Sequence, residues 1–258
     1  MAKKRRKLAD GFASSVETLT PAAQIEPEVK IPRTFPEVQV PIEVRFVLEG
    51  CSLRPIQRGS SCVLMTIDKF ETLAAKKSLG SLRPELVHQA LLAVVDSPLC
   101  KAGAVKQILL LTDDGKILNV NPQYRVPRTY AKFSSAFAHV VSTKDSLEGD
   151  DMSLVSLLRP PVEQYLPLPA TLISLSRRGS RGRLRDVLES DLPVVGSGGP
   201  SKSLVFLVGA STTSSTLESN VCDGERTAVL SMSRYPLSAS SVISRVTSEL
   251  ECVFEQYL

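Results

Sequence analysis

Side chains that usually supply nucleophilic or metal chemistry are scarce in this chain of 258 residues. It has two histidines, His88 and His139, and neither has the cysteine or histidine neighbours of a metal site. The nucleophile-elbow pattern GxSxG and the phosphate-binding pattern GxxxxGKS/T are both absent. We therefore interpret both histidines as packed or hydrogen-bonded structural residues, and we predict no bound metal.

Paired cysteines and long apolar runs are missing as well. The five cysteines are odd in number and include no CxxC pair, so we expect reduced thiols in an intracellular protein and no zinc site. No apolar run reaches the roughly 20 residues that span a bilayer, and no apolar stretch follows the start MAKKRRKLAD as it would in a secretory signal. These absences predict a soluble protein with no membrane partner.

Positive charge is concentrated at the N-terminus. The net charge is +4, and removing the five basic residues Lys3–Lys7 leaves 26 basic residues against 27 acidic ones. Residues 1–41 are rich in Pro, Glu, Thr and Lys without sustained periodicity, which predicts a disordered basic arm before a domain at residues 42–258. The arm is open to three interpretations: a nuclear or nucleolar address, a flexible segment that touches RNA, or a solvated terminus.

Apolar runs separated by turn residues predict an α/β fold with a largely parallel sheet. Strands are predicted at Ile42–Gly50, Cys62–Ile67, Ile108–Thr112, Ile117–Val120, Leu154–Leu158, Thr171–Leu175 and Leu204–Val208. Helices are predicted from an N-cap at Ser81 to a stop at Pro98, at Thr129–Val141 and at Ser238–Phe254. The residues 113–116 (DDGK) predict a hairpin turn, and RRGSRGRLR (177–185) and GSGGPSKS (196–203) predict loops.

Three separated segments stand out along the chain. They are RPELVHQALLAVVDSPL (83–99), NPQYRVPRTYAKF (121–133) and SRYPLSAS (233–240). In this order they resemble motifs of the SPOUT-class methyltransferases of eukaryotes and archaea, which methylate nitrogen-1 of a pseudouridine in small-subunit ribosomal RNA. The resemblance covers the chain from about Ile42 to the C-terminus.

The resemblance implies a SPOUT-type α/β trefoil knot with a mostly parallel sheet, a homodimer, and S-adenosylmethionine as methyl donor. It places the donor contacts on one strand before RRGSRG, on the strand LVFLVGAS, and on the loop before the last helix. The implied residues are Leu175, Gly209, Ala210, Ser214, Met232, Ser233, Arg234, Tyr235, Pro236 and Leu237. Without the resemblance, the same residues fit a strand end followed by a helix cap at Ser238.

The chain departs from the family pattern at four places around this pocket. Arg234 stands where the family usually has asparagine, and Ser214 stands where a second glycine is expected. Arg159-Pro160-Pro161 replaces Lys-Asn-Pro, and Leu175 aligns roughly with an expected threonine. These departures keep open an alternative, a catalytically degenerate homologue that binds RNA and acts as a ribosome assembly factor.

The first two segments carry the candidate RNA-binding residues. The resemblance assigns RNA contacts to Arg83, Arg125, Arg128 and Lys132, and it makes Glu85 the acid that braces an RNA-binding arginine. Arginine binds phosphate oxygens through two parallel hydrogen bonds, and tyrosines between the arginines can stack on unpaired bases. The alternative is a solvated charged face in which Tyr124 and Tyr130 are packed.

A single carboxylate, Asp96, is the weak candidate for a catalytic proton acceptor. It could equally cap the turn after the first helix, and we favour the turn. Methyl transfer suits a chain without an obvious nucleophile or metal, because positioning an acceptor nitrogen in line with an activated methyl group is the main task. We expect a nucleolar rRNA methyltransferase that works with pre-ribosomal assembly factors. A generic RNA-binding module with a basic tail also fits the composition.

Overall fold

The computed structural model describes residues 42–59, 61–67, 82–149, 152–167, 170–188, 202–210 and 226–254. The predicted arm at residues 1–41, Ser81, Ser214 and most of the GSGGPSKS segment lie outside these residues. The described elements, in chain order, are β1 (Ile42–Cys51), β2 (Pro55–Arg58), β3 (Ser61–Leu64), α2 (Pro84–Val95), α3 (Pro98–Lys101), β4 (Val105–Thr112), β5 (Ile117–Val120), α4 (Tyr130–Thr143), β6 (Leu147–Glu148), β7 (Ser153–Leu158), η1 (Glu163–Tyr165), β8 (Ala170–Arg181), α5 (Leu184–Leu188), β9 (Lys202–Gly209), β10 (Arg226–Ser231) and α6 (Ala239–Phe254).

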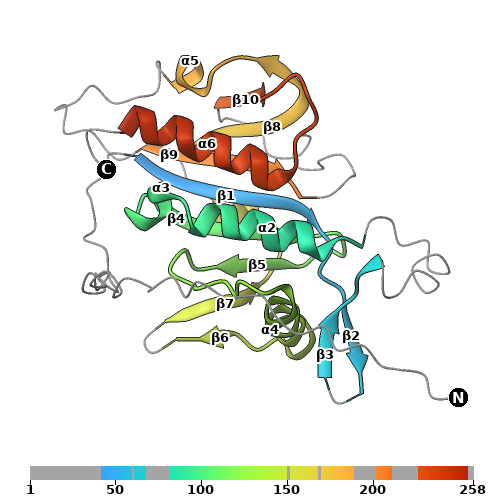
Figure 1. The fold of residues 1–258 in the computed structure, drawn as a ribbon. Coiled ribbons are helices and arrows are strands. Elements are labelled where there is room, and N and C mark those ends of the chain that lie inside the picture. The colour runs from blue at the N-terminus through green and yellow to red at the C-terminus, as the bar shows by residue number, and fades with distance from the viewer. Residues whose placement is uncertain are drawn as a thin grey trace, which may run out of the picture. The chain divides into compact units, whose positions relative to one another are not determined.

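An eight-stranded sheet in the order β10-β8-β9-β1-β4-β5-β7-β6 forms the centre of the fold (Figure 1). The neighbouring strands from β10 to β4 are all parallel. The strands β5, β7 and β6 extend the sheet in antiparallel fashion. The predicted α/β class with a mostly parallel sheet is therefore confirmed.

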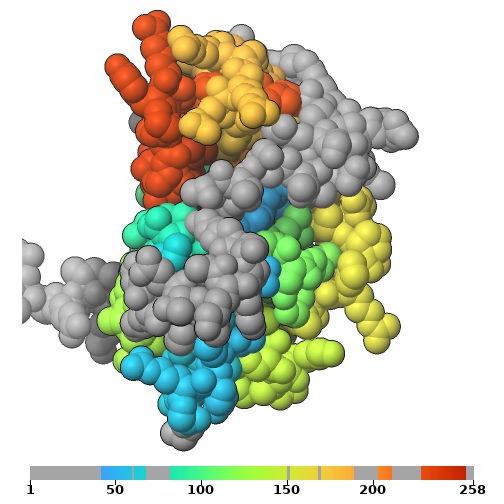
Figure 2. Space-filling model, turned by 90° about the vertical axis from the view of Figure 1, so that its right-hand side faces the viewer, coloured from blue at the N-terminus to red at the C-terminus, as the bar shows by residue number. Residues whose placement is uncertain are grey.

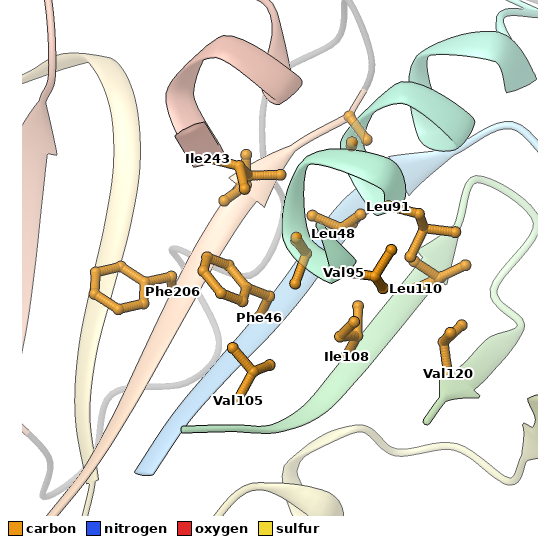
Figure 3. Close-up of a cluster of buried hydrophobic side chains, with 14 of the residues drawn as sticks. Phe46, Leu48, Leu91, Val95, Val105, Ile108, Leu110, Val120, Phe206 and Ile243 are labelled. Carbon is orange, nitrogen blue, oxygen red and sulfur yellow. The ribbon is translucent and has the colours of Figure 1, made fainter. Parts of the chain in front are cut away.

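Strand β1 is apolar on both faces because the sheet is covered on both sides. Phe46 and Leu48 face the helices, and the Phe46 ring stacks on Phe206 of β9 with centroids 5.6 Å apart. Leu91 of α2 and Ile243 of α6 complete this cluster (Figure 3). A second cluster on the other face includes Val47 of β1, Leu109 of β4, Val205 of β9, and Val162 and Leu166 beside η1.

Helices α2 and α6 lie side by side over the parallel strands, and α4 lies at the antiparallel end of the sheet (Figure 1). The pattern of Phe133, Phe137 and Val140 predicts the buried face of α4, and all three side chains are fully buried. No helix in the described ranges is long and apolar enough to cross a membrane.

The first helix and the strand after residue 61 differ from their predicted bounds. Helix α2 begins at Pro84 with Arg83 as its N-cap, so the prediction of Ser81 as the cap is wrong. Pro98 does not end α2 directly but begins α3, whose N-cap Ser97 accepts a hydrogen bond from the Cys100 N–H (3.1 Å). Strand β3 ends at Leu64 because it pairs with the short β2 in a separate two-stranded sheet.

The predicted loop RRGSRGRLR is also wrong. Strand β8 continues through Arg181, and Leu184–Leu188 form the short helix α5. The strand has an irregularity between two paired stretches, because Ser174 pairs with Val229 of β10 whereas Ser180 pairs with the next residue, Leu230. Glycine and serine are typical of loops, but here a neighbouring strand supplies the hydrogen bonds that keep the segment extended.

Candidate functional site

The carboxyl ends of the parallel strands gather the predicted donor-binding residues at one edge of the sheet. Gly209 at the end of β9 pairs with Glu49 of β1, and Leu175 of β8 pairs with Val208. Strand β10 ends at Ser231, directly before the loop at residues 232–237. In open α/β sheets, this edge is where ligands bind. The structure therefore brings Leu175, Gly209, Ala210 and the 232–237 loop to a plausible place for a small molecule.

Gly209 borders open space. Among the described residues, no atom lies within 4 Å of the position that a Cβ atom would occupy there, and its φ lies outside the left-handed region. Neither packing against those residues nor backbone conformation therefore requires glycine at this position. The next residue, Ala210, is buried and its N–H donates to the Glu49 carbonyl (2.8 Å), which fixes the end of the strand. The bare backbone at Gly209 leaves room for a bound group to approach closely.

Hydrogen bonds shape the loop after β10. The Ser231 hydroxyl donates to the Ser233 carbonyl (3.0 Å), and the Tyr235 N–H donates to the Ser233 hydroxyl (3.0 Å). Tyr235 has 75% of its surface exposed, and Arg234 and Pro236 are exposed as well. The loop thus has a defined backbone, and its side chains at Arg234, Tyr235 and Pro236 face outward.

Two of the predicted donor residues contact the core with their side chains. Met232 is buried in the main hydrophobic cluster, and Leu175 is half-buried against it. A ligand at this edge would therefore meet Met232 chiefly through its main chain. The helix-cap alternative also holds, because the Ser238 hydroxyl accepts from the Ser241 N–H at the start of α6 (3.3 Å). The two readings are compatible, since the cap orients the loop.

Glu49 is a residue at this edge that the sequence analysis missed. Glu49 is buried, with 3% of its surface exposed, although its side chain carries a carboxyl group. It lies opposite Gly209 at the end of β1, where the parallel register places it beside the candidate site. An acidic residue closing the apolar run IEVRFVLEG was the available signal. Buried carboxylates near a ligand site are common hydrogen-bond acceptors for hydroxyl groups.

The candidate RNA residues lie along α2 and at the start of α4. The segment before α4 is anchored to α2, because the His88 ring nitrogen Nε2 is 2.7 Å from the Pro127 carbonyl oxygen. His88 is buried and stacks on Phe133 with ring centroids 4.5 Å apart, which confirms its structural role. Arg125 and Lys132 are exposed on either side of this anchor. His139, in contrast, is exposed on α4, so the prediction of a packed residue is wrong there.

Two of the candidate arginines have acidic partners. Arg83 forms an ion pair with Glu85 in the first turn of α2, which is the contact that a bracing role needs, and the role itself stays a prediction. Oxygen Oε2 of Glu85 is buried and has no hydrogen-bond partner within the described part of the chain. One more donor could therefore be accepted at this carboxylate.

Asp96 and Arg128 join the end of α2 to the start of α4. Both guanidinium nitrogens Nη1 and Nη2 of Arg128 donate to the Asp96 carboxylate, the Nη2–Oδ1 distance being 2.9 Å. Asp96 is also the C-cap of α2, and its N–H donates to the Leu92 carbonyl (3.0 Å). The favoured interpretation of Asp96 as a turn residue is confirmed. Both carboxylate oxygens are occupied by Arg128.

The interleaved tyrosines are packed rather than free to stack on bases. Tyr124 lies against Phe137 with ring centroids 6.4 Å apart, and Tyr130 lies 6.1 Å from Phe133. Burial raises the pKa of Tyr130 to about 12, with a further rise from the nearby Glu85 charge. The packing of both tyrosines, which the alternative predicts, is therefore observed, while RNA binding by the charged face stays a prediction.

The described residues contain no group of His, Cys, Asp and Glu side chains that could hold a metal ion. Among those residues, the site therefore consists of backbone, small side chains and one buried carboxylate at the sheet edge, and of exposed basic side chains near α4. Such a set can position ligands and bind a polyanion, and its described members include no obvious covalent nucleophile.

Comparison with known proteins agrees with this arrangement. The family model for the EMG1/NEP1 methyltransferase matches residues 46–251. The ribosomal RNA small subunit methyltransferase NEP1 of Mus musculus is 30% identical over 212 residues, which cover 81% of this chain and 80% of that protein. The Homo sapiens protein of the same name is 30% identical over 211 residues, covering 81% and 80%.

A solved structure shows the same fold. The crystal structure of Archaeoglobus fulgidus Nep1 bound to S-adenosylhomocysteine matches with a TM-score of 0.65 at 20% identity, covering 83% of this chain and 100% of that chain. The predicted α/β fold is thereby confirmed as the Nep1 fold, while its knot stays a prediction. From the matched family model, the sequence relatives and the shared fold, we conclude that this chain belongs to the EMG1/NEP1 methyltransferase family.

Proposed function

We propose that this protein methylates nitrogen-1 of a pseudouridine in small-subunit ribosomal RNA, with S-adenosylmethionine as methyl donor. The observation that carries the proposal is the open space beside Gly209 at the carboxyl edge of the sheet. A glycine that no contact with the described residues requires, next to a hydrogen-bonded loop and a buried carboxylate, fits a site kept clear for a ligand.

Leu175, Gly209, Ala210 and the main chain of Met232–Leu237 would hold the donor, together with Ser214 outside the described residues. When bound, the donor supplies a methyl group already activated by its sulfonium. The protein then has to hold the acceptor nitrogen in line and exclude competing water. This division of labour agrees with the described site, where both oxygens of the Asp96 carboxylate bind Arg128.

Arg83, Arg125, Arg128 and Lys132 would bind the substrate RNA. Their side chains lie around one extended segment before α4. His88 of α2 contacts the Pro127 carbonyl in this segment, so the backbone that carries the basic side chains is held in place. Tyr124 and Tyr130 pack against phenylalanine rings of α4, support this segment and would not contact bases. Sequence-specific recognition of RNA usually targets unpaired nucleotides in loops, where phosphates and base edges are accessible together.

Calorimetric titration with S-adenosylmethionine tests the donor site. The wild-type protein should bind the donor with micromolar affinity, whereas Gly209→Val should abolish binding because its side chain fills the open space. RNA affinity of the variant should stay within about threefold, a difference of ~0.7 kcal/mol, which serves as the internal control for folding. A bulky side chain at position 209 that leaves donor binding intact would show that the pocket is elsewhere.

The alternative function is an RNA-binding assembly factor that does not transfer methyl groups. Arg234 favours it, because an exposed arginine replaces the family's usual asparagine within the donor loop. The same titration separates the two functions. Undetectable donor binding by the wild-type protein, with RNA affinity intact, would support the assembly factor.

We also propose that the protein acts as a homodimer in the nucleolus, together with pre-ribosomal assembly factors. The dimer follows from the family resemblance, and the basic cluster Lys3–Lys7 supports the nucleolar address. Sedimentation at micromolar concentration should show a dimer. A monomer under these conditions would contradict the proposed assembly.

A further inference from the structure

A second basic segment lies outside the RNA site described above. We define the arginine segment as residues 176–186, and its arginines are Arg177, Arg178, Arg181, Arg183 and Arg185. All five are exposed, and Asp186 is the only acid in the segment. The segment thus carries a formal excess of four positive charges, which equals the +4 net charge of the whole chain.

The backbone of the arginine segment is fixed rather than free. Arg181 pairs with Ser231 of β10, and the Ser180 hydroxyl donates to the Val229 carbonyl (3.1 Å). A Cβ atom on Gly179 would lie 2.6 Å from the carbonyl carbon of Leu230, so only glycine allows the two strands to approach this closely. The Leu184 N–H donates to the carboxylate of Glu249 on α6 (2.9 Å). The arginines therefore project from a defined strand and helix start.

Their guanidinium groups contrast with other arginines of the protein. Arg45, Arg54, Arg83 and Arg128 each form an ion pair with an acidic side chain. Within the described ranges, none of the five arginines of the segment forms an ion pair or a side-chain hydrogen bond. A cluster of like charges without acidic partners repels itself and adds nothing to folding stability. Its arrangement suits an external polyanion.

The arginine segment also adjoins the proposed donor site. Arg181 lies opposite Ser231, and the donor loop begins at the next residue, Met232. Residues 170–188 gather at the top of the face in Figure 2, beside the C-terminal elements. The Arg125 surface belongs to the β5 side of the sheet, four strands away from β8. At ~4.8 Å between strands, the separation across the sheet alone is about 20 Å. Because β5 runs antiparallel to β4, Arg125 follows the end of β5 that lies near the start of β4, so the two surfaces are also offset along the strands.

We propose that the arginine segment is a second RNA-contacting surface, which holds the phosphates of the strand that flanks the target nucleotide beside the donor loop. Arginine is the side chain best suited to phosphate oxygens, and the intervening glycines and serines leave the guanidinium groups clear of bulky neighbours. The proposal rests on the proposed function, because it takes RNA as the polyanion that reaches this edge of the sheet.

The test is a fluorescence anisotropy titration of an RNA stem-loop with single-stranded flanks, repeated from 50 to 300 mM salt. The variant R181A/R183A should bind about tenfold more weakly near 150 mM salt, and the slope of log affinity against log salt should fall by about 1.5, since about 0.7 is lost for each single-stranded phosphate contact. The control R58A/K144A removes the same charge from exposed positions on β2 and at the C-terminal end of α4 and should change neither quantity.

A second variant separates the effect of positive charge from the effect of the paired hydrogen-bond donors of arginine. R181K/R183K keeps both charges but loses the paired donors of arginine, so it should restore most of the salt slope and part of the affinity. Thermal unfolding of all variants should match the wild type, because the replaced side chains are exposed.

The possible failures can be told apart. Wild-type binding that R181A/R183A leaves unchanged in affinity and slope would overturn the arginine segment alone, with the proposed function intact. Equal losses in R58A/K144A would reduce the effect to net charge and would also overturn it. Loss of binding to a poly-glutamate peptide, with RNA binding unchanged, would identify the segment as a surface for an acidic protein instead. If the wild type binds no RNA, both proposals fall.

Discussion

At the residue scale, the basic side chains near α4 differ in whether a carboxylate already holds them. Arg83 is paired with Glu85, and Arg128 is paired with Asp96 although 70% of its side chain is exposed. Arg125 is exposed and has no ionic partner within the ranges that the structure describes. Because an unpaired arginine gives up no ion pair when it meets a phosphate, Arg125 should contribute the largest share of binding among the three.

Arg125→Ala should weaken RNA binding by roughly 1–3 kcal/mol and lower the salt slope by about one. The reason is the loss of one arginine–phosphate contact, while the donor edge of the sheet is untouched. Anisotropy titrations at several salt concentrations give both quantities, and calorimetry should show unchanged donor binding. Lys144→Ala, which removes an exposed charge at the C-terminal end of α4, is the matched control. Unchanged RNA affinity and slope for Arg125→Ala would mean that the RNA face is misplaced.

Asp114 provides a pH test of the β4–β5 turn. Burial alone would raise the pKa of Asp114, but hydrogen bonds from Lys116 and Thr112 outweigh it and lower the pKa below its ordinary value. The Thr112 hydroxyl donates to Asp114 Oδ1 at 2.5 Å, and the Lys116 ammonium contacts Oδ2. A lowered folded-state pKa stabilises the protein above the unfolded pKa, and this stability is lost as pH falls through the folded value.

Asp114→Asn should therefore lower the free energy of unfolding at pH 7 by less than about 1 kcal/mol, since the pair is largely exposed. The difference from the wild type should shrink as pH falls from the ordinary aspartate pKa of about 4 through the lower folded-state pKa of Asp114. Urea unfolding between pH 7 and pH 3 measures this. A constant difference over that range would contradict the ionic origin of the effect.

At the scale of elements, the sequence predicts those elements whose formation depends on local patterns. The β4–β5 hairpin follows from the residues at its turn, where Gly115 has φ 81°. Strand β1 follows from its apolar run. The second half of β8 could not be predicted, since its composition is that of a loop and its partner β10 lies far along the chain. Helix α2 begins later than Ser81 because Pro84 occupies its first turn.

The candidate site was predictable to a similar degree. Its positions at strand ends follow from where the apolar runs stop, so Gly209 and the 232–237 loop could be identified. The burial of Glu49 and the packing of Tyr124 and Tyr130 depend on neighbours from other elements, which no local pattern reveals. The pairing of Asp96 with Arg128 likewise joins two helices that are separate in sequence.

The close approach of β8 and β10 gives an element-scale prediction. Gly179→Ala should lower the free energy of unfolding by about 1–3 kcal/mol, because the new Cβ meets the backbone of Leu230 and that backbone must shift. Gly182→Ala is the matched control in the same segment. The nearest atom to its Cβ is Leu230 Cδ2 at 3.9 Å, an ordinary contact, so its stability should be almost unchanged. Equal stability of the two variants would contradict the observed strand packing.

At the scale of the whole molecule, one sheet holds the candidate donor site and the candidate RNA surface at separate places. Its parallel strands end at an edge that suits a small ligand, and its antiparallel end supports α4 and the Arg125 surface (Figure 1). A fold is shared more widely than a function, so the Nep1 fold alone does not establish activity. Activity depends on whether the edge around Gly209 still binds the donor despite Arg234 and the other departures.

Methyl transfer to a defined RNA tests the proposed activity most directly. The protein is incubated with S-adenosylmethionine carrying a deuterated methyl group and with a stem-loop that has one pseudouridine in its loop. A second stem-loop has uridine at that position, where nitrogen-1 is bonded to the ribose and cannot accept a methyl group. Mass spectrometry of the digested nucleosides should show deuterated N1-methylpseudouridine from the first RNA alone, and none with Gly209→Val. Bound RNA without any methylated product from the wild-type protein would contradict the proposed activity.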